Sequence, residues 1–358
     1  MPDTFIPLTI KAVERETAEA ISVLFDVPSN HSDAFAFKAG QHLTLRADIN
    51  GEEVRRNYSL CAAPNEGKLR VAIKQISGGA FSTWANETLR PGQALDVMPP
   101  HGSFTWEFDA ARQANYLGFA GGSGITPILS LLKTALTEEP KSSFTLLYGN
   151  RATANIIFLE EIAAMKDKFM GRLQVYHFLE DELEDIELFN GRLDSDKLAD
   201  LVGGLFDPEE VTAAFICGPG PMMDAVEESL QKAGLSEDQI LLERFTAGRP
   251  TAAQAAAEKE IIQKVAGLEM QVRLEGRTRK LVFDGQQENI LDTARAKGLP
   301  APYACKAGVC ATCRAKLLSG EVKMRATYGL TKEDIEAGYV LTCQAIPLSE
   351  DVVLDFEG

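Results

Sequence analysis

Short apolar runs separated by turn residues fill the first hundred positions of the chain. Residues 20–27, 41–49, 69–76 and 94–100 contain Val, Ile, Leu or Phe residues, and Gly, Pro or Asn residues lie beside them. Runs of this length with such boundaries are typical of antiparallel strands. The pattern therefore predicts an antiparallel β-barrel over residues 1–110.

The pattern changes near residue 111, after which apolar strands alternate with segments of helical periodicity. That alternation is typical of a doubly wound parallel sheet with helices on both faces. We therefore predict a second domain of this kind over residues 111–247. Its predicted strands are residues 115–122, 143–150, 173–179, 213–217 and 239–245, and its predicted helices are residues 125–136, 158–168 and 221–234.

A third part follows a change in composition. Residues 246–260 read TAGRPTAAQAAAEKE and contain no bulky apolar side chain, which is typical of an interdomain linker that is helical in part. We place the linker at residues 248–264 and a small domain at residues 265–358. A length of 358 residues agrees with two to three domains, given about 150 residues per domain.

The composition limits the partners of the chain. Hydrophobic residues make up 45% and charged residues 25%, as in ordinary globular proteins. The formal net charge of −16 disfavours binding to phosphate backbones and anionic lipid headgroups, so we expect neither nucleic acid nor membrane as a partner. No apolar run approaches the roughly 18 residues that a membrane span needs, and the first residues lack a signal-peptide pattern. We expect a cytoplasmic location.

Four of the six cysteines fall within the last 54 residues. Cys305 and Cys310 have four residues between them, Cys310 and Cys313 have two, and Cys343 follows after 29 more. This is the ligand spacing of a plant-type [2Fe–2S] cluster. The alternatives are a zinc site, which usually combines two short Cys-x2-Cys pairs, and buried free thiols. The spacing favours the iron–sulfur cluster.

A glycine-rich turn follows the predicted strand at residues 115–122. Gly122 and Gly124 precede a helix, so their backbone can approach a pyrophosphate that also accepts hydrogen bonds from the helix N-terminus. Cys217 begins a second turn, Cys-Gly-Pro, at the carboxyl end of another predicted strand. Tight turns also need glycine for geometry alone, but two of them at the carboxyl edge of one sheet favour a nucleotide site.

Arg151 follows the second predicted strand of this domain, where the sequence Tyr-Gly-Asn-Arg contains no carboxylate. Sites for NAD usually carry an acidic residue in this region, whereas an arginine suits the 2′-phosphate of NADP. The pattern therefore favours NADPH over NADH as the electron donor. The alternative is that Arg151 is an ordinary solvated arginine.

Five short motifs occur in the order RNYS, GGxxS, GGSGITP, CGPxPMM and ERF. Each alone is a plain strand end or turn, but together they resemble the ferredoxin–NADP⁺ reductase family over residues 5–245. The resemblance implies an FAD-binding barrel followed by an NADP-binding domain, and GGSGITP is closer to the bacterial oxygenase reductases than to the plant enzymes. The resemblance implies that the flavin is contacted by Arg56, Tyr58 and Ser59 and its pyrophosphate by Gly79 and Ser82, with Glu243 and Phe245 near the flavin. It implies roles in nucleotide binding for Gly122, Gly124, Thr126 and Cys217. The implied catalytic residues are Ser59, Cys217 and Glu243.

The tail resembles the plant-type ferredoxin domain in the segments ENILDTARAKGLPAPYACKAGVCATCRAKLLSGEV and YVLTCQAIP. The resemblance implies a β-grasp fold and a one-electron carrier. NAD(P)H releases two electrons as a hydride, a [2Fe–2S] cluster accepts one, and a flavin passes electrons between the two. The order of the modules therefore predicts an electron path from NADPH to FAD to [2Fe–2S] to an external acceptor.

No residue pattern for activating oxygen is visible in the sequence. His31, His42, His101 and His177 are scattered and lack the spaced carboxylates of a di-iron site. The expected partner is therefore the set of oxygenase subunits of a multicomponent monooxygenase.

Within the family, the chain resembles the reductase subunits of phenylacetyl-CoA epoxidases in segments such as FKAGQHLTLRADINGEEVRRNYSL and FTLLYGNR. This similarity implies electron delivery to a di-iron oxygenase that epoxidises the ring of phenylacetyl-CoA in aerobic phenylacetate catabolism. One alternative is another acceptor, such as a ring-hydroxylating dioxygenase or a hybrid-cluster protein. A second alternative is a redox-sensing or docking module.

Overall fold

The computed structural model describes residues 4–183, 185–245 and 252–358. The chain divides into two compact units, one formed by Phe5–Glu243 and the other containing Arg244–Gly358. Each unit has apolar cores of its own. Among the helices in the described ranges, none is long and apolar enough to cross a membrane.

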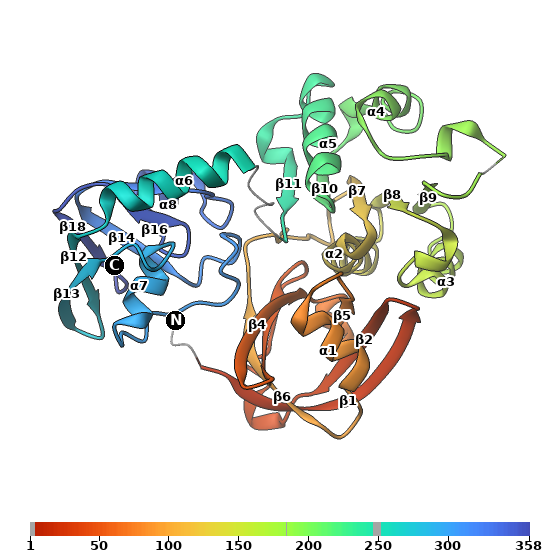
Figure 1. Ribbon diagram of the computed structural model, residues 1–358. Helices are drawn as coiled ribbons and strands as arrows, with labels where there is room; N and C mark the ends of the chain where they lie inside the picture. The colour runs from red at the N-terminus through yellow and green to blue at the C-terminus, as the bar shows by residue number, and fades with distance from the viewer. Residues whose placement is uncertain (1–3, 184, 246–251) are drawn as a thin grey trace. The chain divides into compact units, whose positions relative to one another are not determined.

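The first part of Phe5–Glu243 is an antiparallel sheet in the order β4-β3-β6-β1-β2-β5 (Figure 1). An antiparallel bridge between Leu60 and Val71 joins its two edges, so the sheet closes into a barrel, as the sequence predicts. Alternate residues such as Leu8 and Ile10 of β1 are buried inside it, whereas Thr9 between them is exposed, which explains the alternation in the sequence. Its elements are β1 (Ile6–Thr17), β2 (Ala20–Asp26), β3 (His42–Ile49), β4 (Glu52–Ser59), β5 (Leu69–Lys74), α1 (Ala80–Thr88) and β6 (Ala94–His101).

Helix α1 is an addition to the sequence-based description, which gives only a turn at this position. Phe81 and Ala85 lie one helical turn apart and are both buried in the barrel core. Their burial stabilises a helix of nine residues that would be marginal in isolation. The turn at Gly79 therefore continues into a helix N-terminus.

The second part of Phe5–Glu243 is a parallel sheet in the order β11-β10-β7-β8-β9, as predicted. One apolar core combines the sheet with α2 and α3, and a second core combines its opposite face with α4 and α5. Helix α4 lies in a stretch where no helix is expected from the sequence. The elements are β7 (Asn115–Gly121), α2 (Ile125–Glu138), β8 (Ser143–Asn150), α3 (Leu159–Lys168), β9 (Leu173–Leu179), α4 (Ser195–Leu201), β10 (Ala213–Cys217), α5 (Gly220–Lys232) and β11 (Ile240–Glu243).

Arg244–Gly358 contains a mixed sheet in the order β13-β12-β18-β14-β16 and a small sheet of β15 and β17. Helix α6 occupies much of the predicted linker, while residues 246–251 lie outside the described ranges. Phe283, Ile290 and Leu291 are fully buried and join the sheet to α7. The elements are α6 (Ala252–Val265), β12 (Leu268–Leu274), β13 (Arg277–Phe283), α7 (Ile290–Ala296), β14 (Arg314–Ser319), β15 (Val322–Met324), α8 (Lys332–Glu336), β16 (Tyr339–Leu341), β17 (Ala345–Pro347) and β18 (Val352–Asp355).

Candidate functional site

The two glycine turns meet at the carboxyl edge of the parallel sheet. β7 and β10 are neighbours, with Ala120 opposite Cys217. A Cβ on Gly124 would stand 2.0 Å from the carbonyl oxygen of Cys217, and a Cβ on Gly121 would stand 2.5 Å from Cδ of Pro219. Only glycine permits this approach of the two backbones. The turns therefore form one continuous surface at the end of the sheet, where such folds bind nucleotides.

The first turn presents backbone N–H groups to that surface. Gly122 has φ +52°, in the left-handed region, and its carbonyl oxygen accepts a hydrogen bond from the hydroxyl of Tyr148 at 3.0 Å. The Thr126 hydroxyl donates to the carbonyl oxygen of Ser123 at 3.0 Å, so it holds the turn in shape. The N-terminus of α2 is left to supply donors and a positive dipole to a pyrophosphate.

The three predicted catalytic residues come together at the end of the barrel strand β4. Ser59 lies opposite His42 in the β3–β4 pairing, and Nδ1 of His42 lies 3.8 Å from Oε1 of Glu243. Glu243 lies opposite Cys217 in the β10–β11 pairing. Ser59, His42 and Cys217 are buried. Ser59 and Glu243 thus both lie beside His42, and Cys217 lies next to Glu243 in the parallel sheet.

The charge states of this group follow from burial. Burial, followed by the neighbouring His101, holds the pKa of His42 well below its usual value, so its ring is neutral at neutral pH. Burial, followed by the charge of Glu243, raises the pKa of the Cys217 thiol well above its usual value. Asn57 fixes the His42 ring through a contact of 3.2 Å between Nδ2 and Nε2. Cys217 is therefore a neutral thiol with no nucleophilic character.

The remaining predicted flavin residues lie in other places. Arg56 and Tyr58 face the side of β4 opposite to Ser59, because side chains alternate along a strand. The Ser82 hydroxyl accepts a hydrogen bond from the Ile76 N–H at 3.1 Å and donates to the Gly79 carbonyl at 3.2 Å. This hydroxyl is engaged in the loop, so a pyrophosphate here would be met by the α1 N-terminus. Phe245 belongs to the second unit and is 38% exposed.

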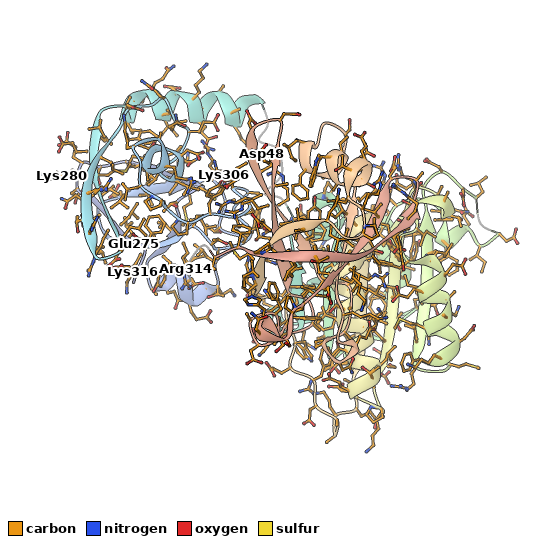
Figure 2. The ribbon with its side chains drawn as sticks, turned by 90° about the horizontal axis from the view of Figure 1, so that it is seen from below. Asp48, Glu275, Lys280, Lys306, Arg314 and Lys316 are labelled. Atoms are coloured by element: carbon orange, nitrogen blue, oxygen red, sulfur yellow. The ribbon has the colours of Figure 1, made fainter. Side chains whose placement is uncertain are left out.

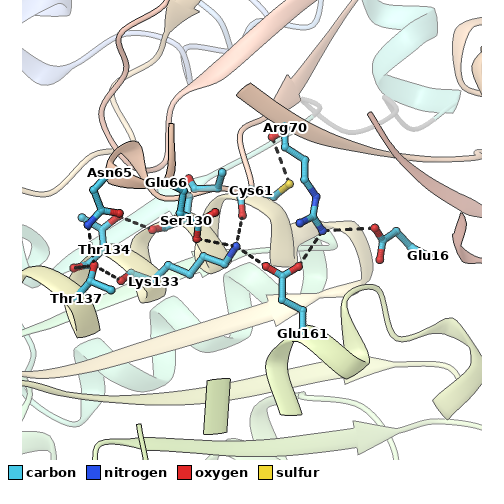
Figure 3. Close-up of polar contacts among 11 residues, drawn as sticks. Glu16, Cys61, Asn65, Glu66, Arg70, Ser130, Lys133, Thr134, Thr137 and Glu161 are labelled. Carbon is cyan, nitrogen blue, oxygen red and sulfur yellow. Dashed lines mark hydrogen bonds and ion pairs between the residues drawn. The ribbon is translucent and has the colours of Figure 1, made fainter. Parts of the chain in front are cut away.

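A polar face of α2 is buried against the barrel loop that follows β4 (Figure 3). The Ser130 hydroxyl donates to the Ala62 carbonyl at 2.7 Å, and the Lys133 amine donates to the Cys61 carbonyl at 3.3 Å. This loop is continuous with β4, and α2 begins at the glycine-rich turn. The hydrogen bonds therefore fix the strand of the predicted flavin site relative to the predicted nucleotide turn.

Charged side chains extend this contact between the barrel and the parallel-sheet domain. Lys133, with a side chain that is 6% exposed, pairs with Glu66 at 3.2 Å and with Glu161 of α3. Arg70 pairs with Glu161 at 2.8 Å and with Glu16 at 3.4 Å. Burial acts to raise the pKa of Glu161, but Lys133 and Arg70 outweigh it and hold that pKa below its usual value. The carboxylate is therefore ionised and shared by two cations.

Arg151 is half-exposed at the end of β8. Its Nη2 atom pairs at 2.6 Å with Oε2 of Glu19, which lies in the turn between β1 and β2 of the barrel. The two residues are 132 positions apart in the sequence. The Glu19 carboxylate therefore lies at the end of β8, although the sequence around Arg151 contains no acidic residue.

The four clustered cysteines lie together in the second unit. A hydrogen bond joins the thiols of Cys305 and Cys310, and another joins those of Cys313 and Cys343. Across the described ranges, no three His, Cys, Asp or Glu side chains converge as a site for a single metal ion. Two pairs suit a [2Fe–2S] cluster, in which each of two irons takes two cysteines, better than a tetrahedral zinc site.

The backbone around these thiols suits bound sulfur. N–H groups of Cys305 and Ala307 point at the sulfurs of Cys310 and Cys305, at 3.4 and 3.2 Å. A Cβ on Gly308, with φ +74°, would stand 2.8 Å from Cγ of Gln344, so the loop is closely wrapped. Such N–H donors stabilise negative charge on a cluster. The loop therefore fits the group that the spacing predicts.

The acidity of the chain is confined to the first unit. Residues 5–243 contain 36 acidic and 20 basic residues, whereas residues 244–358 contain 15 and 16. Lys306 and Arg314 are among the basic side chains labelled in Figure 2. Lys306 pairs with Asp292 at 2.7 Å, and Arg314 pairs with Asp334 at 2.5 Å. The surface near the cysteines is thus balanced in charge.

Family models match all three parts of the chain. The oxidoreductase FAD-binding domain matches residues 7–106, the oxidoreductase NAD-binding domain matches residues 119–228, and the 2Fe-2S iron-sulfur cluster binding domain matches residues 272–348. One of the subunits of the 1,2-phenylacetyl-CoA epoxidase of Escherichia coli (strain K12) is 44% identical over 354 residues, which cover 99% of this chain and 98% of that protein. The chain belongs to the NAD(P)H-dependent iron–sulfur flavoprotein reductases. FAD, a pyridine nucleotide and a [2Fe–2S] cluster are its cofactors.

Other relatives of the reductase are similar along their whole length. The ferredoxin reductase component of the 3-ketosteroid-9-alpha-monooxygenase of Rhodococcus rhodochrous is 38% identical, with 98% of this chain and 96% of that protein covered. The structure of phthalate dioxygenase reductase superposes with a TM-score of 0.59 at 24% identity and covers 99% and 98% of the two chains. It shares the fold.

Three residues of the reductase site are absent from the sequence-based set. Glu19 and His42 reach their places through strand pairing in the barrel, and no local motif marks either residue. Lys133 carries a usable signal, because residues 125–137 of its helix are otherwise apolar or hydroxylic. A charge in such a helix indicates a buried partner.

Proposed function

We propose that the reductase delivers electrons from NADPH, through FAD and the [2Fe–2S] cluster, to a di-iron oxygenase that epoxidises the ring of phenylacetyl-CoA, and that it works in the cytoplasm. The observation that supports this choice of acceptor is the similarity to the Escherichia coli protein over nearly the whole of both chains. Relatives that serve other oxygenases are less similar, at 38% identity or lower. The parts of the chain would be residues 1–110, 111–247 and 265–358, with a linker at 248–264.

The residues would divide the work between the three cofactors. Flavin would be held by Arg56, Tyr58 and Ser59, with Gly79, Ser82 and the α1 N-terminus at its pyrophosphate, and Phe245 near its ring. Bound flavin accepts a hydride and releases electrons one at a time. The chain's own part is to bring the nicotinamide to the flavin, through Gly122, Gly124 and Thr126, and to bury the reacting atoms between Ser59, Cys217 and Glu243. Cys305, Cys310, Cys313 and Cys343 would hold the cluster.

The electrostatics favour docking by shape at the cluster rather than by long-range attraction. The second unit is nearly neutral, and its basic side chains near the cluster are paired. The negative charge of the first unit is the part that could steer a basic oxygenase surface. We expect association with the oxygenase to depend only weakly on salt when residues 244–358 make the contact.

Reconstitution tests the proposed acceptor. The purified holoenzyme is mixed with phenylacetyl-CoA epoxidase oxygenase subunits, phenylacetyl-CoA, oxygen and NADPH, and the epoxide or its downstream product is measured by mass spectrometry. We expect product that depends on this chain. NADPH oxidation without product would move the acceptor to another system, such as a ring-hydroxylating dioxygenase or a hybrid-cluster protein. Cluster reduction much slower than turnover would instead favour a redox-sensing or docking module.

Arg151 gives a direct prediction for the nucleotide. Arg151→Ala should raise KM for NADPH by about tenfold and leave KM for NADH within about twofold, because a charged hydrogen bond to phosphate is lost only with NADPH. Steady-state reduction of ferricyanide with each nucleotide measures both values. Equal changes with the two nucleotides would remove Arg151 from the 2′-phosphate role.

A further inference from the structure

The turn between β1 and β2 carries a carboxylate from the barrel to the nucleotide domain. Glu19 pairs with Arg151 at 2.6 Å, with side chains that are 42% and 52% exposed. The backbone N–H of Glu19 donates to Oγ1 of Thr17 at 3.2 Å, and its carbonyl accepts from the Gln75 N–H at 2.7 Å. The carboxylate therefore stands on a backbone that is fixed on both sides.

A third charged side chain places this pair beside the glycine-rich turn. Lys74, at the end of β5, has its Nζ 3.5 Å from the position that a Cβ on Gly122 would occupy. The Lys74 amine is close enough to Glu19 and Arg151 for both charges to act on it. Glu19, Lys74 and Arg151 thus form a group of two cations and one anion at the turn that meets the nucleotide.

The chemistry of this group matches the point at which NAD and NADP differ. Sites that bind NAD usually present a carboxylate to the ribose 2′-hydroxyl, from the end of the second strand of the nucleotide domain, and an arginine accommodates a 2′-phosphate. Here β8 is that strand, and its tip carries Arg151 and no carboxylate. Glu19 supplies a carboxylate at the same tip from another domain.

We propose that Glu19 sets the discrimination between NADH and NADPH. The 2′-hydroxyl of NADH donates a hydrogen bond to the Glu19 carboxylate, which stays paired with Arg151. The 2′-phosphate of NADPH takes Arg151 and must displace Glu19, because two anions cannot share the site without repulsion. This inference rests on the role proposed for Arg151 and adds the residue that opposes it.

Glu19→Gln tests the proposal by separating the two nucleotides. We expect kcat/KM with NADPH to rise about threefold, since Arg151 is released from a half-exposed ion pair, and kcat/KM with NADH to fall about threefold, since a charged acceptor is lost. The preference thus shifts by about tenfold toward NADPH. Binding without turnover is measured by calorimetry on the oxidised holoenzyme, where 2′,5′-ADP should bind more tightly to the variant and 5′-AMP should bind more weakly.

Glu14→Gln is the matched control. Glu14 is exposed on β1, carries the same charge and lies five residues away from Glu19. We expect Glu14→Gln to change kcat/KM with NADH and kcat/KM with NADPH by the same factor. This control therefore measures the effect of the change in net charge alone. The proposal is wrong if Glu19→Gln changes kcat/KM with NADH and with NADPH by the same factor. It is also wrong if Glu19→Gln leaves the binding of both 2′,5′-ADP and 5′-AMP unchanged. A wild-type preference for NADH would refute NADPH as the donor, yet Glu19→Gln would still shift the preference if the proposal holds.

Discussion

Cys310→Ser should abolish electron transfer to one-electron protein acceptors and spare the flavin reaction. We expect cytochrome c reduction to fall by about a hundredfold or more, because the cluster loses a thiolate ligand from one of its irons. NADPH-dependent ferricyanide reduction should stay within about twofold, since hydride transfer to flavin does not need the cluster. Iron and acid-labile sulfide content and the two activities measure these effects.

Cys61→Ser is the matched control for this substitution. The Cys61 thiol is fully buried in the first unit and donates to the Arg70 carbonyl at 3.3 Å, a bond that a hydroxyl can also make. Burial raises its pKa to about 12, so it has no thiolate to give to iron. Both activities should survive. If both also survive undiminished in Cys310→Ser, electrons do not pass through the cluster.

Lys133→Met should destabilise the first unit by about 1–3 kcal/mol, because the buried Lys133 amine is lost as a partner of the Cys61 carbonyl and of the partly buried Glu161 carboxylate. Urea unfolding of the FAD-loaded protein, followed by flavin fluorescence, measures the loss. Lys141→Met, at an exposed lysine, should change stability by less than about 0.5 kcal/mol. An equal effect of the two substitutions would show that the buried network contributes little.

The same network gives the sign of one pH dependence. The folded state holds the pKa of Glu161 below its usual value, so the stability contributed by the ionised carboxylate is present above that usual value. It is lost as the pH falls through the folded-state pKa. Adding Glu161→Gln to Lys133→Met should recover part of the lost stability, because the carboxylate that Lys133 opposed is then neutral, while Arg70 keeps its ion pair with Glu16.

Local chemistry made much of the site predictable from the sequence. The cysteine spacing and the glycine turns depend on a few consecutive residues, because a cluster loop and a strand-to-helix turn are each built by one segment. Strand alternation in the barrel also follows from burial on one face, as Leu8 and Ile10 of β1 show.

Residues that are placed by tertiary contacts cannot be predicted from local sequence patterns. Glu19 reaches Arg151 only because a barrel hairpin lies against the nucleotide domain, and no sequence period encodes such a contact. His42 is paired with Ser59 by the β3–β4 register, and with His101 by the β3–β6 register. Histidines that are scattered in the sequence are thus brought together by strand pairing. The sequence predicts only a turn where helix α1 lies, because tertiary burial of Phe81 and Ala85, rather than a clear helical period, stabilises this helix.

The order of electron transfer is the central claim, and anaerobic rapid mixing of the holoenzyme with NADPH tests it most directly. Flavin absorbance and the electron paramagnetic resonance of the reduced cluster are followed in the same samples. We expect the flavin to be reduced first and the cluster signal to grow afterwards, at a rate no slower than turnover with the oxygenase. In Cys310→Ser the first phase should remain and the second should disappear. A cluster that is reduced before the flavin, or more slowly than turnover, would contradict the proposed path.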